Sequence, residues 1–196
     1  MISLLLLNVI VVQKGAKLTI TSGATIQFAD SKAADYPTYI LVERGGKLEV
    51  QGGAKLTGLT ACGTMWDGIY VEGTNTAPHP AVNEVLIGTY PTVSSNHGVV
   101  LINTGATIEN ARVAIKAQSP IVANYPSFDG GIIICDGANF KNNVVDLYFG
   151  SFGQTNISGA RNCNFLTNAK LLDAIESPYA HIYMEQMKTG IQLRGN

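Results

Sequence analysis

The amino-acid sequence predicts an all-β solenoid in which short parallel strands stack coil upon coil. The segment 11–26, VVQKGAKLTITSGATI, recurs thirty residues later as LVERGGKLEVQGGAKL at 41–56. Its apolar runs are short, rich in β-branched and aliphatic residues, and bounded by Gly, Asn and Asp, which is typical of strands. A unit this small does not bury its own apolar face, so successive units must stack on one another.

The two copies of the repeat agree in detail. Lys17–Ile20 and Lys47–Val50 alternate with a period of two, which predicts strands with one inward and one outward face. The copies share six residues at the thirty-residue offset: Val12/Val42, Gly15/Gly45, Lys17/Lys47, Leu18/Leu48, Gly23/Gly53 and Ala24/Ala54. Each unit therefore contains an apolar run, a glycine turn, an alternating run and a second glycine turn.

The apolar start of the chain, MISLLLLNVIVV, is interpreted as the first core strand. It has no Lys or Arg before the apolar run and no small-residue cleavage site, so it differs from a signal peptide. It is also shorter than the roughly 20 residues that cross a membrane. A remnant targeting segment is the alternative, and no membrane span is expected.

The units further along the chain are less regular. A polar loop over 29–38 precedes the second unit, and Trp66–Gly73 is a degenerate third unit. A long excursion over 74–96 follows, for which we expect one short strand at Val85–Ile87. The pattern returns at 98–110 and again at 130–142.

An apolar residue stands five positions before a turn glycine in four units, which predicts that these four residues stack: Ile10, Ile40, Val100 and Ile132. Phe140–Asn143 is echoed at Phe165–Asn168, and Met187–Leu193 is expected to form a last partial coil. Only Ala169–Glu176 is compatible with a short helix. The chain thus predicts about seven coils.

Composition limits the possible partners. The chain has 196 residues, enough for one domain (residues 1–196), and 46% hydrophobic residues, which excludes disorder. A net charge of −1 gives no reason to expect nucleic acid or an anionic membrane as a partner. No polar cap is evident before Val9 or after Leu193, so we expect a segment of a longer protein, covered by neighbouring domains or by end-to-end stacking of copies.

Single residue types carry further structural predictions. Trp66 lies in phase with the repeat and is expected in the core or at a corner. Three cysteines do not all pair within one chain, so Cys62, Cys135 and Cys163 are interpreted as free core or turn residues, with one disulfide as the alternative. Six asparagines are expected at turns, where the side-chain amide caps the turn and forms ladders: Asn103, Asn110, Asn142, Asn162, Asn164 and Asn168.

With these features the chain resembles the right-handed parallel β-helix, or pectin-lyase-like, domains of secreted and cell-surface bacterial proteins. The resemblance rests on the Gly-Ala turns, on the W-x-G-I-x-V element at Trp66–Val71, and on the I-x-N and F-x-N-N steps at 108–110 and 140–143. It implies a right-handed coil and a secreted or surface location. It does not identify a reaction, because function must come from a site rather than from a fold.

The sequence favours a non-catalytic module over an enzyme. Hydrolases with the resembled fold have clustered Asp residues, a Gly-His-Gly and an Arg-x-Lys, because glycoside cleavage needs two placed carboxylates. Here the Asp residues are scattered, His97 lacks the leading glycine, and Arg-x-Lys does not occur. A lyase of this fold would need a calcium-binding carboxylate group, for which Asp129, Asp136 and Asp146 are the candidates; we expect them to be solvated turn residues.

No cofactor or metal site is predicted. Metal ligation needs at least three converging donors, whereas His79, His97 and His181 are isolated in the sequence.

The candidate ligand-binding residues are three tyrosines that each precede a proline: Tyr36, Tyr90 and Tyr125. Each lies in a loop before a core strand. If the loops leave the coil at one corner, the rings line one edge and can stack on sugar faces. The alternative is that each ring packs on its own loop.

We therefore expect a structural or adhesive module that contacts an extracellular polysaccharide or cell-surface glycan. The first alternative is a polysaccharide lyase or glycoside hydrolase of the same fold, with calcium in the lyase case. The second is a phage or virion fibre domain.

Overall fold

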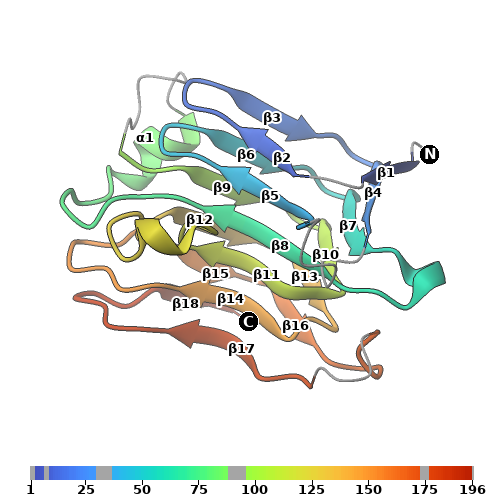
Figure 1. The fold of residues 1–196 in the computed structure, drawn as a ribbon. Helices are drawn as coiled ribbons and strands as arrows, with labels where there is room; N and C mark the ends of the chain where they lie inside the picture. The colour runs from blue at the N-terminus through green and yellow to red at the C-terminus, as the bar shows by residue number, and fades with distance from the viewer. Residues whose placement is uncertain (1–2, 7–8, 30–36, 88–95, 173–176, 196) are drawn as a thin grey trace.

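The computed structural model describes residues 3–6, 9–29, 37–87, 96–172 and 177–195. Its strands form three parallel sheets of six strands each, and the chain visits the three sheets in turn (Figure 1). The predicted right-handed parallel β-helix is confirmed. The described strands make six coils, one fewer than the roughly seven expected.

The three sheets are named A, B and C. Sheet A contains β1 (Ser3–Leu6), β4 (Thr25–Phe28), β7 (Lys55–Gly58), β10 (Thr107–Glu109), β13 (Asn139–Lys141) and β16 (Asn164–Leu166). Sheet B contains β2 (Ile10–Val12), β5 (Tyr39–Val42), β8 (Trp66–Val71), β11 (Ala111–Ala117), β14 (Val145–Phe149) and β17 (Ala180–Met184). Sheet C contains β3 (Lys17–Ile20), β6 (Lys47–Val50), β9 (Val99–Ile102), β12 (Ile132–Asp136), β15 (Gly159–Arg161) and β18 (Gln192–Arg194).

The sequence repeat sets the register of the first coils. Val12 pairs with Val42 in sheet B, and Lys17 and Leu18 pair with Lys47 and Leu48 in sheet C. The later echo is also confirmed, since Phe140 pairs with Phe165. Equivalent residues stack because parallel pairing in register places each inward side chain on its own copy in the next coil.

One part of the predicted register is wrong. Ile10 does pair with Ile40 in sheet B, but Val100 and Ile132 lie in sheet C. There Val100 pairs with Leu48 of β6, and Ile132 pairs with Val99. Each unit contains two glycine turns after similar apolar runs, so spacing from a glycine alone does not distinguish the two corners.

The interior is filled by columns of apolar side chains. In sheet A, Ile26, Leu56, Ile108 and Phe140 follow one another in register, and all are buried. Each such side chain stabilises the fold by about 1.5–3 kcal/mol relative to an exposed one. Trp66 is fully buried, as predicted, and stacks on Phe28 with ring centroids 4.1 Å apart.

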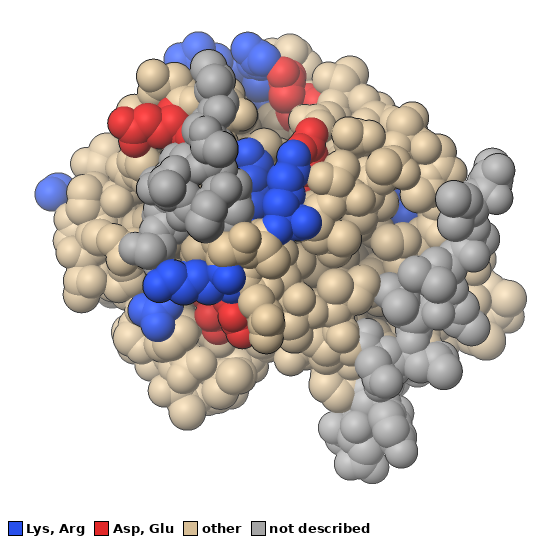
Figure 2. All heavy atoms as spheres, turned by 90° about the horizontal axis from the view of Figure 1, so that it is seen from above, with Lys and Arg blue, Asp and Glu red and all other residues tan. Residues whose placement is uncertain are grey.

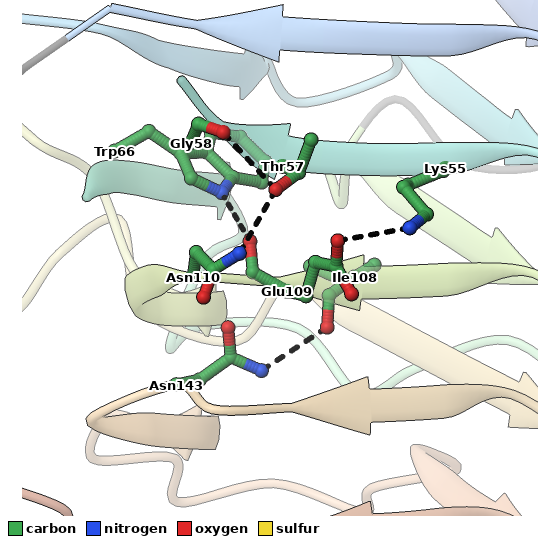
Figure 3. A network of polar contacts seen from close by, with 8 residues as sticks. All are labelled: Lys55, Thr57, Gly58, Trp66, Ile108, Glu109, Asn110 and Asn143. Carbon is green, nitrogen blue, oxygen red and sulfur yellow. Dashed lines mark hydrogen bonds and ion pairs between the residues drawn. The ribbon is translucent and has the colours of Figure 1, made fainter. Parts of the chain in front are cut away.

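The corner between sheets A and B is held by asparagine (Figure 3). Asn110 has φ 59°, and its side-chain amide donates to Thr57 Oγ1 of the preceding coil at 3.1 Å. Asn143 donates to Ile108 O at 3.2 Å, and the Trp66 indole donates to Glu109 O at 3.1 Å. Asparagine suits this corner because it tolerates left-handed backbone and links one coil to the next.

Other turns also follow the sequence prediction. Asn142 and Asn162 have positive φ like Asn110. Asn164 begins strand β16 rather than lying in a turn, but its side chain donates to Asn139 Oδ1 at 2.9 Å in the expected ladder. The turn glycines Gly45 and Gly53 have φ near +80°, a region that residues with a Cβ rarely adopt.

The excursion over 74–96 does not contain the expected strand. Val82–Ile87 is instead the helix α1. Val85 is buried against Val99, Leu101 and Ile132 on the outer face of sheet C. The strands of sheet C are already hydrogen-bonded to the strands of neighbouring coils. The segment therefore forms a helix, in which its backbone N–H and C=O groups bond to one another. Lys47 Nζ also donates to Val85 O at 3.0 Å.

Three remaining predictions have mixed outcomes. The described part of the proposed helix at Ala169–Glu176, residues 169–172, is not helical, and 173–176 lie outside the described residues. The apolar start forms two strands on two sheets, β1 and β2, rather than one. Cys135 and Cys163 are buried and Cys62 is exposed, and none of the three forms a disulfide.

The surface carries few charges, and several of the described ones pair between coils. Lys17 contacts Glu49 at 2.6 Å, and Lys55 contacts Glu109 at 3.0 Å. Figure 2 looks down on the coil with β1 and β3, and there basic and acidic side chains lie mostly in adjacent groups on an otherwise uncharged surface. Exposed pairs of this kind contribute at most about 1 kcal/mol each.

Candidate functional site: an aromatic row on sheet B

An outward-facing row of side chains crosses sheet B from coil to coil. Tyr70 of β8 is in register with Lys116 of β11, which is in register with Tyr148 of β14. Tyr148 is in turn in register with Tyr183 of β17. Neighbouring strands are about 4.8 Å apart, so the row presents one ring or one cation per coil.

Further tyrosines extend the row at both ends. Tyr39 of β5 meets Tyr70 edge to face, with centroids 5.2 Å apart. Tyr148 and Tyr183 stack at 5.0 Å, and Tyr179 lies 5.8 Å from Tyr183. Tyr179 is 70% exposed, and the other rings are partly exposed. We call these residues, together with Lys116 and Tyr125, the tyrosine row.

Lys116 occupies the centre of the row among three rings. Its Nζ lies 4.5 Å from the Tyr148 centroid, 5.6 Å from that of Tyr125 and 5.8 Å from that of Tyr70. A cation this close to aromatic faces is attracted by their quadrupoles. Tyr125 comes from the loop after the 3-10 turn η2 (Val122–Asn124), so this loop adds a ring to the row formed by the strands.

Hydrogen-bonding groups flank the rings. The Tyr148 hydroxyl donates to Glu185, which also accepts from Ser151 Oγ at 3.0 Å. On an earlier coil, Arg112 lies 3.6 Å from Asp67. The face therefore combines flat apolar rings with carboxylate, hydroxyl and guanidinium groups at their edges.

Burial shifts the ionisation of the row. It raises the pKa of the Tyr70 and Tyr148 phenols, and the Glu185 carboxylate adds to the effect at Tyr148. Burial lowers the pKa of Lys116, while the charges of Glu185 and Asp129 oppose that change. The phenols therefore stay neutral and able to donate at physiological pH.

Asp129 lies beside this row and is fully buried. Burial raises its pKa to about 6, the Gln118 side chain opposes the rise, and the charge of Glu185 adds to it. The carboxylate packs against the backbone at Gly150, where an added Cβ would lie 2.8 Å from Asp129 Cγ. The expectation of a solvated carboxylate is thus wrong for Asp129.

The other two candidate carboxylates have separate partners. Asp136 at the end of β12 forms an ion pair with Arg161 of β15 on sheet C. Asp146 of β14 is buried, accepts from Asn143 at 2.7 Å, and lies 2.6 Å from His181 Nδ1. Asp146 is therefore also not a solvated turn residue, and the three carboxylates belong to three different contacts.

Two of the histidines, although isolated in sequence, meet in the fold. His79 Nε2 and His97 Nδ1 each lie 2.8 Å from Gly130 O, and their ring centroids are 4.7 Å apart. Ile157 N donates to His79 Nδ1 at 3.1 Å, so His79 carries its proton on Nε2 and donates to the carbonyl. Among the described residues, no three His, Cys, Asp or Glu side chains gather as a metal site would require.

Of the three tyrosines singled out from the sequence, the structure places Tyr125 in the row. Tyr36 and Tyr90 lie outside the described residues. Sequence reasoning missed the strand tyrosines, although a signal exists. Three strands carry a tyrosine between two apolar residues: Ile69-Tyr70-Val71, Leu147-Tyr148-Phe149 and Ile182-Tyr183-Met184. Alternation places such a tyrosine outward.

The fold defines the class of the protein as a right-handed parallel β-helix with an aromatic outer face on one sheet. Searches against protein-family models, curated proteins and solved structures each gave no match to this chain. Within the described part of the chain, no helix has the length and apolar character needed to cross a membrane.

Proposed function

We propose that this chain is a non-catalytic module of a secreted or surface-displayed protein that binds an extended glycan along the tyrosine row. One observation carries the proposal: four consecutive coils place Tyr70, Lys116, Tyr148 and Tyr183 in register on the same outward face. Tyr39, on the preceding coil, meets Tyr70 edge to face. Partly exposed rings on a rigid scaffold provide apolar contact surface and phenol hydroxyls for sugars. Glu185, Ser151 and Asp67 supply polar groups for sugar hydroxyls.

The row also matches the shape of such a ligand. Its rungs repeat at the spacing of stacked strands, about 4.8 Å, which is similar to the step between rings of a β-linked polysaccharide. A polymer lying along the coil axis would therefore meet successive rungs with successive sugars. Because the strands fix the rings, little conformational entropy is lost on binding.

A glycan array of neutral and acidic oligosaccharides tests the proposal. The triple variant Tyr70→Ala, Tyr148→Ala, Tyr183→Ala should weaken binding about 100-fold or more, since each aromatic anchor contributes about 1–2 kcal/mol. The matched control replaces the same three tyrosines by Phe, which keeps the rings and should retain most of the affinity. Circular dichroism should show the same β content in both variants. Unchanged retention of the alanine variant on the array would rule the proposal out.

An enzyme that cleaves a polyuronide is a second proposal, favoured by the ionisable groups at the centre of the row. Burial lowers the pKa of Lys116, which favours its neutral amine as the base that takes the C5 proton of a uronate. The C4–C5 double bond would form as the bond from C4 to the glycosidic oxygen breaks, and water would protonate the leaving oxygen. Among the described residues, no three His, Cys, Asp or Glu side chains gather as a calcium site would require.

Incubation with polygalacturonate and with alginate, with and without calcium, distinguishes the two proposals. Elimination would produce an unsaturated sugar, seen as a rise in ultraviolet absorbance, and Lys116→Gln should abolish it. A chain that binds these polymers but releases no unsaturated or reducing product supports the non-catalytic module.

A further inference from the structure

A pocket of about 300 Å³ lies on sheet C, away from the tyrosine row, between α1 and the outer face of the sheet. Val82 and Leu86 of α1 form one wall, and Leu101 and Ile134 form the floor. Val82 is 38% exposed and Leu86 is 50% exposed, so the helix presents apolar surface to the pocket. This volume is at the lower end of the range for small-molecule sites.

The sequence of sheet C explains why the surface is hollow there. Leu101 of β9 is in register with Ile134 of β12, and Ile134 with Gly159 of β15. Gly159 contributes no side chain to this column of residues on sheet C. A Cβ at this position would lie only 2.4 Å from Gln192 O, so a larger residue does not fit without moving the backbone. The helix is held above the sheet by Val85, which packs on Val99 and Ile132.

The mouth of the pocket carries positive charge. Arg161 donates from Nε to Asp136 Oδ1 at 3.1 Å and also pairs with the second carboxylate oxygen, so these two charges compensate each other. Arg161 is in register with Arg194 of β18, which also lines the pocket. Within the described part of the chain, Arg194 has no ion-pair partner. The two guanidinium groups and one carboxylate leave one net positive charge beside an apolar cavity.

We propose that this pocket binds a small carboxylic acid with a compact apolar body. The body lies between α1 and the floor formed by Leu101 and Ile134, and the carboxylate pairs with Arg194. The apolar walls supply affinity through burial of the ligand body, and the guanidinium selects an anion because its planar donors match a carboxylate. This site is independent of the glycan-binding proposal, because it lies on a different sheet.

Calorimetric titration with 2-naphthoate and with its uncharged analogue 2-naphthamide tests the site. The wild-type chain should bind naphthoate saturably and more tightly than the amide. Arg194→Gln should weaken naphthoate binding about 2–5-fold, as expected for one exposed charged contact, and leave the amide unchanged. Leu86→Glu should weaken both ligands, because it places a carboxylate against the apolar body.

Lys141→Gln, on the outer face of sheet A, is the matched control for loss of one positive charge and should leave both affinities unchanged. Thermal unfolding should be similar for all variants, since Leu86 and Arg194 are exposed. Absence of saturable naphthoate binding overturns the proposal. So does equal affinity for the amide, or a response to Lys141→Gln as large as that to Arg194→Gln.

Discussion

At the scale of the residue, His79 shows how burial changes the pKa of a side chain that looks ordinary in the sequence. The ring stacks on Phe152 with centroids 4.5 Å apart and donates to Gly130 O. Burial, with a smaller contribution from the neighbouring His97, lowers its pKa from 6.5 to about 4. His79 is therefore neutral in the folded protein throughout the physiological pH range.

This shift predicts acid sensitivity. The unfolded chain binds a proton at His79 below about pH 6.5, whereas the folded chain binds it only below about pH 4. His79 therefore stabilises the fold fully above pH 6.5, and this contribution is lost as the pH falls towards 4, by at most about 3 kcal/mol. His79→Gln, which keeps a donor for the carbonyl, should remove that part of the pH dependence.

Urea unfolding at several pH values between 4 and 7 measures the effect. Asp129 changes the stability in the opposite direction as the pH falls. Its pKa is raised in the folded protein, so the folded chain takes up this proton at a higher pH than the unfolded chain and gains stability on acidification. The informative quantity is therefore the difference in unfolding free energy between wild type and His79→Gln. If this difference stays constant from pH 7 to pH 4, the histidine is not the source of acid sensitivity.

At the scale of the element, the corner asparagines combine two roles that can be separated. Asn142 has φ 54°, and its Oδ1 accepts from Asn168 N at 3.1 Å and from Ala169 N at 3.2 Å. Asn142→Gly removes the cap but keeps the backbone unstrained. Asn142→Ala removes the cap and keeps a Cβ in left-handed backbone, without the polar side chain that lets asparagine tolerate it.

The glycine variant should lose about 1 kcal/mol of unfolding free energy, and the alanine variant about 1–2 kcal/mol more. Denaturant titration of both variants gives the two values. Equal stability of the two variants would show that the left-handed backbone carries no cost at this corner.

The elements also show what the sequence could predict. Strands β2, β3, β5 and β6 follow from the glycine-bounded repeat, because stacking in register needs only local alternation and a constant step. Helix α1 does not follow from it, since Val85 is buried by Val99 and Ile132 on the outside of the coil, which is a contact that no repeat encodes. The wrong prediction for Val100 has the same cause. Its pairing with Leu48 places it in sheet C rather than sheet B, and the repeat spacing does not show this contact.

For the candidate site, the sequence prediction and the structure share one residue, Tyr125, which was expected as a contact residue and lies in the row. That it contacts a ligand remains a prediction. The strand tyrosines Tyr70, Tyr148 and Tyr183 come together because their strands stack in register. The segments between these strands differ in length, so the sequence spacing does not show this register. That register is a property of the whole stack rather than of any one unit.

At the scale of the whole molecule, the solenoid repeats both its core and its surface. Each coil contacts only its neighbours, so the tyrosine row is a one-dimensional array of similar contacts on a rigid frame. Such an array predicts that affinity increases with ligand length, as each added sugar reaches another rung, until the row is filled.

Calorimetric titration of wild type and of the Tyr70, Tyr148, Tyr183 triple alanine variant with a length series of the glycan selected on the array is the most direct test. We predict that the wild-type dissociation constant falls about 3–10-fold for each added rung and then levels off. The alanine variant should show little dependence on length. A wild-type affinity that does not change with length, or a variant that keeps the same dependence, would contradict glycan binding along the tyrosine row.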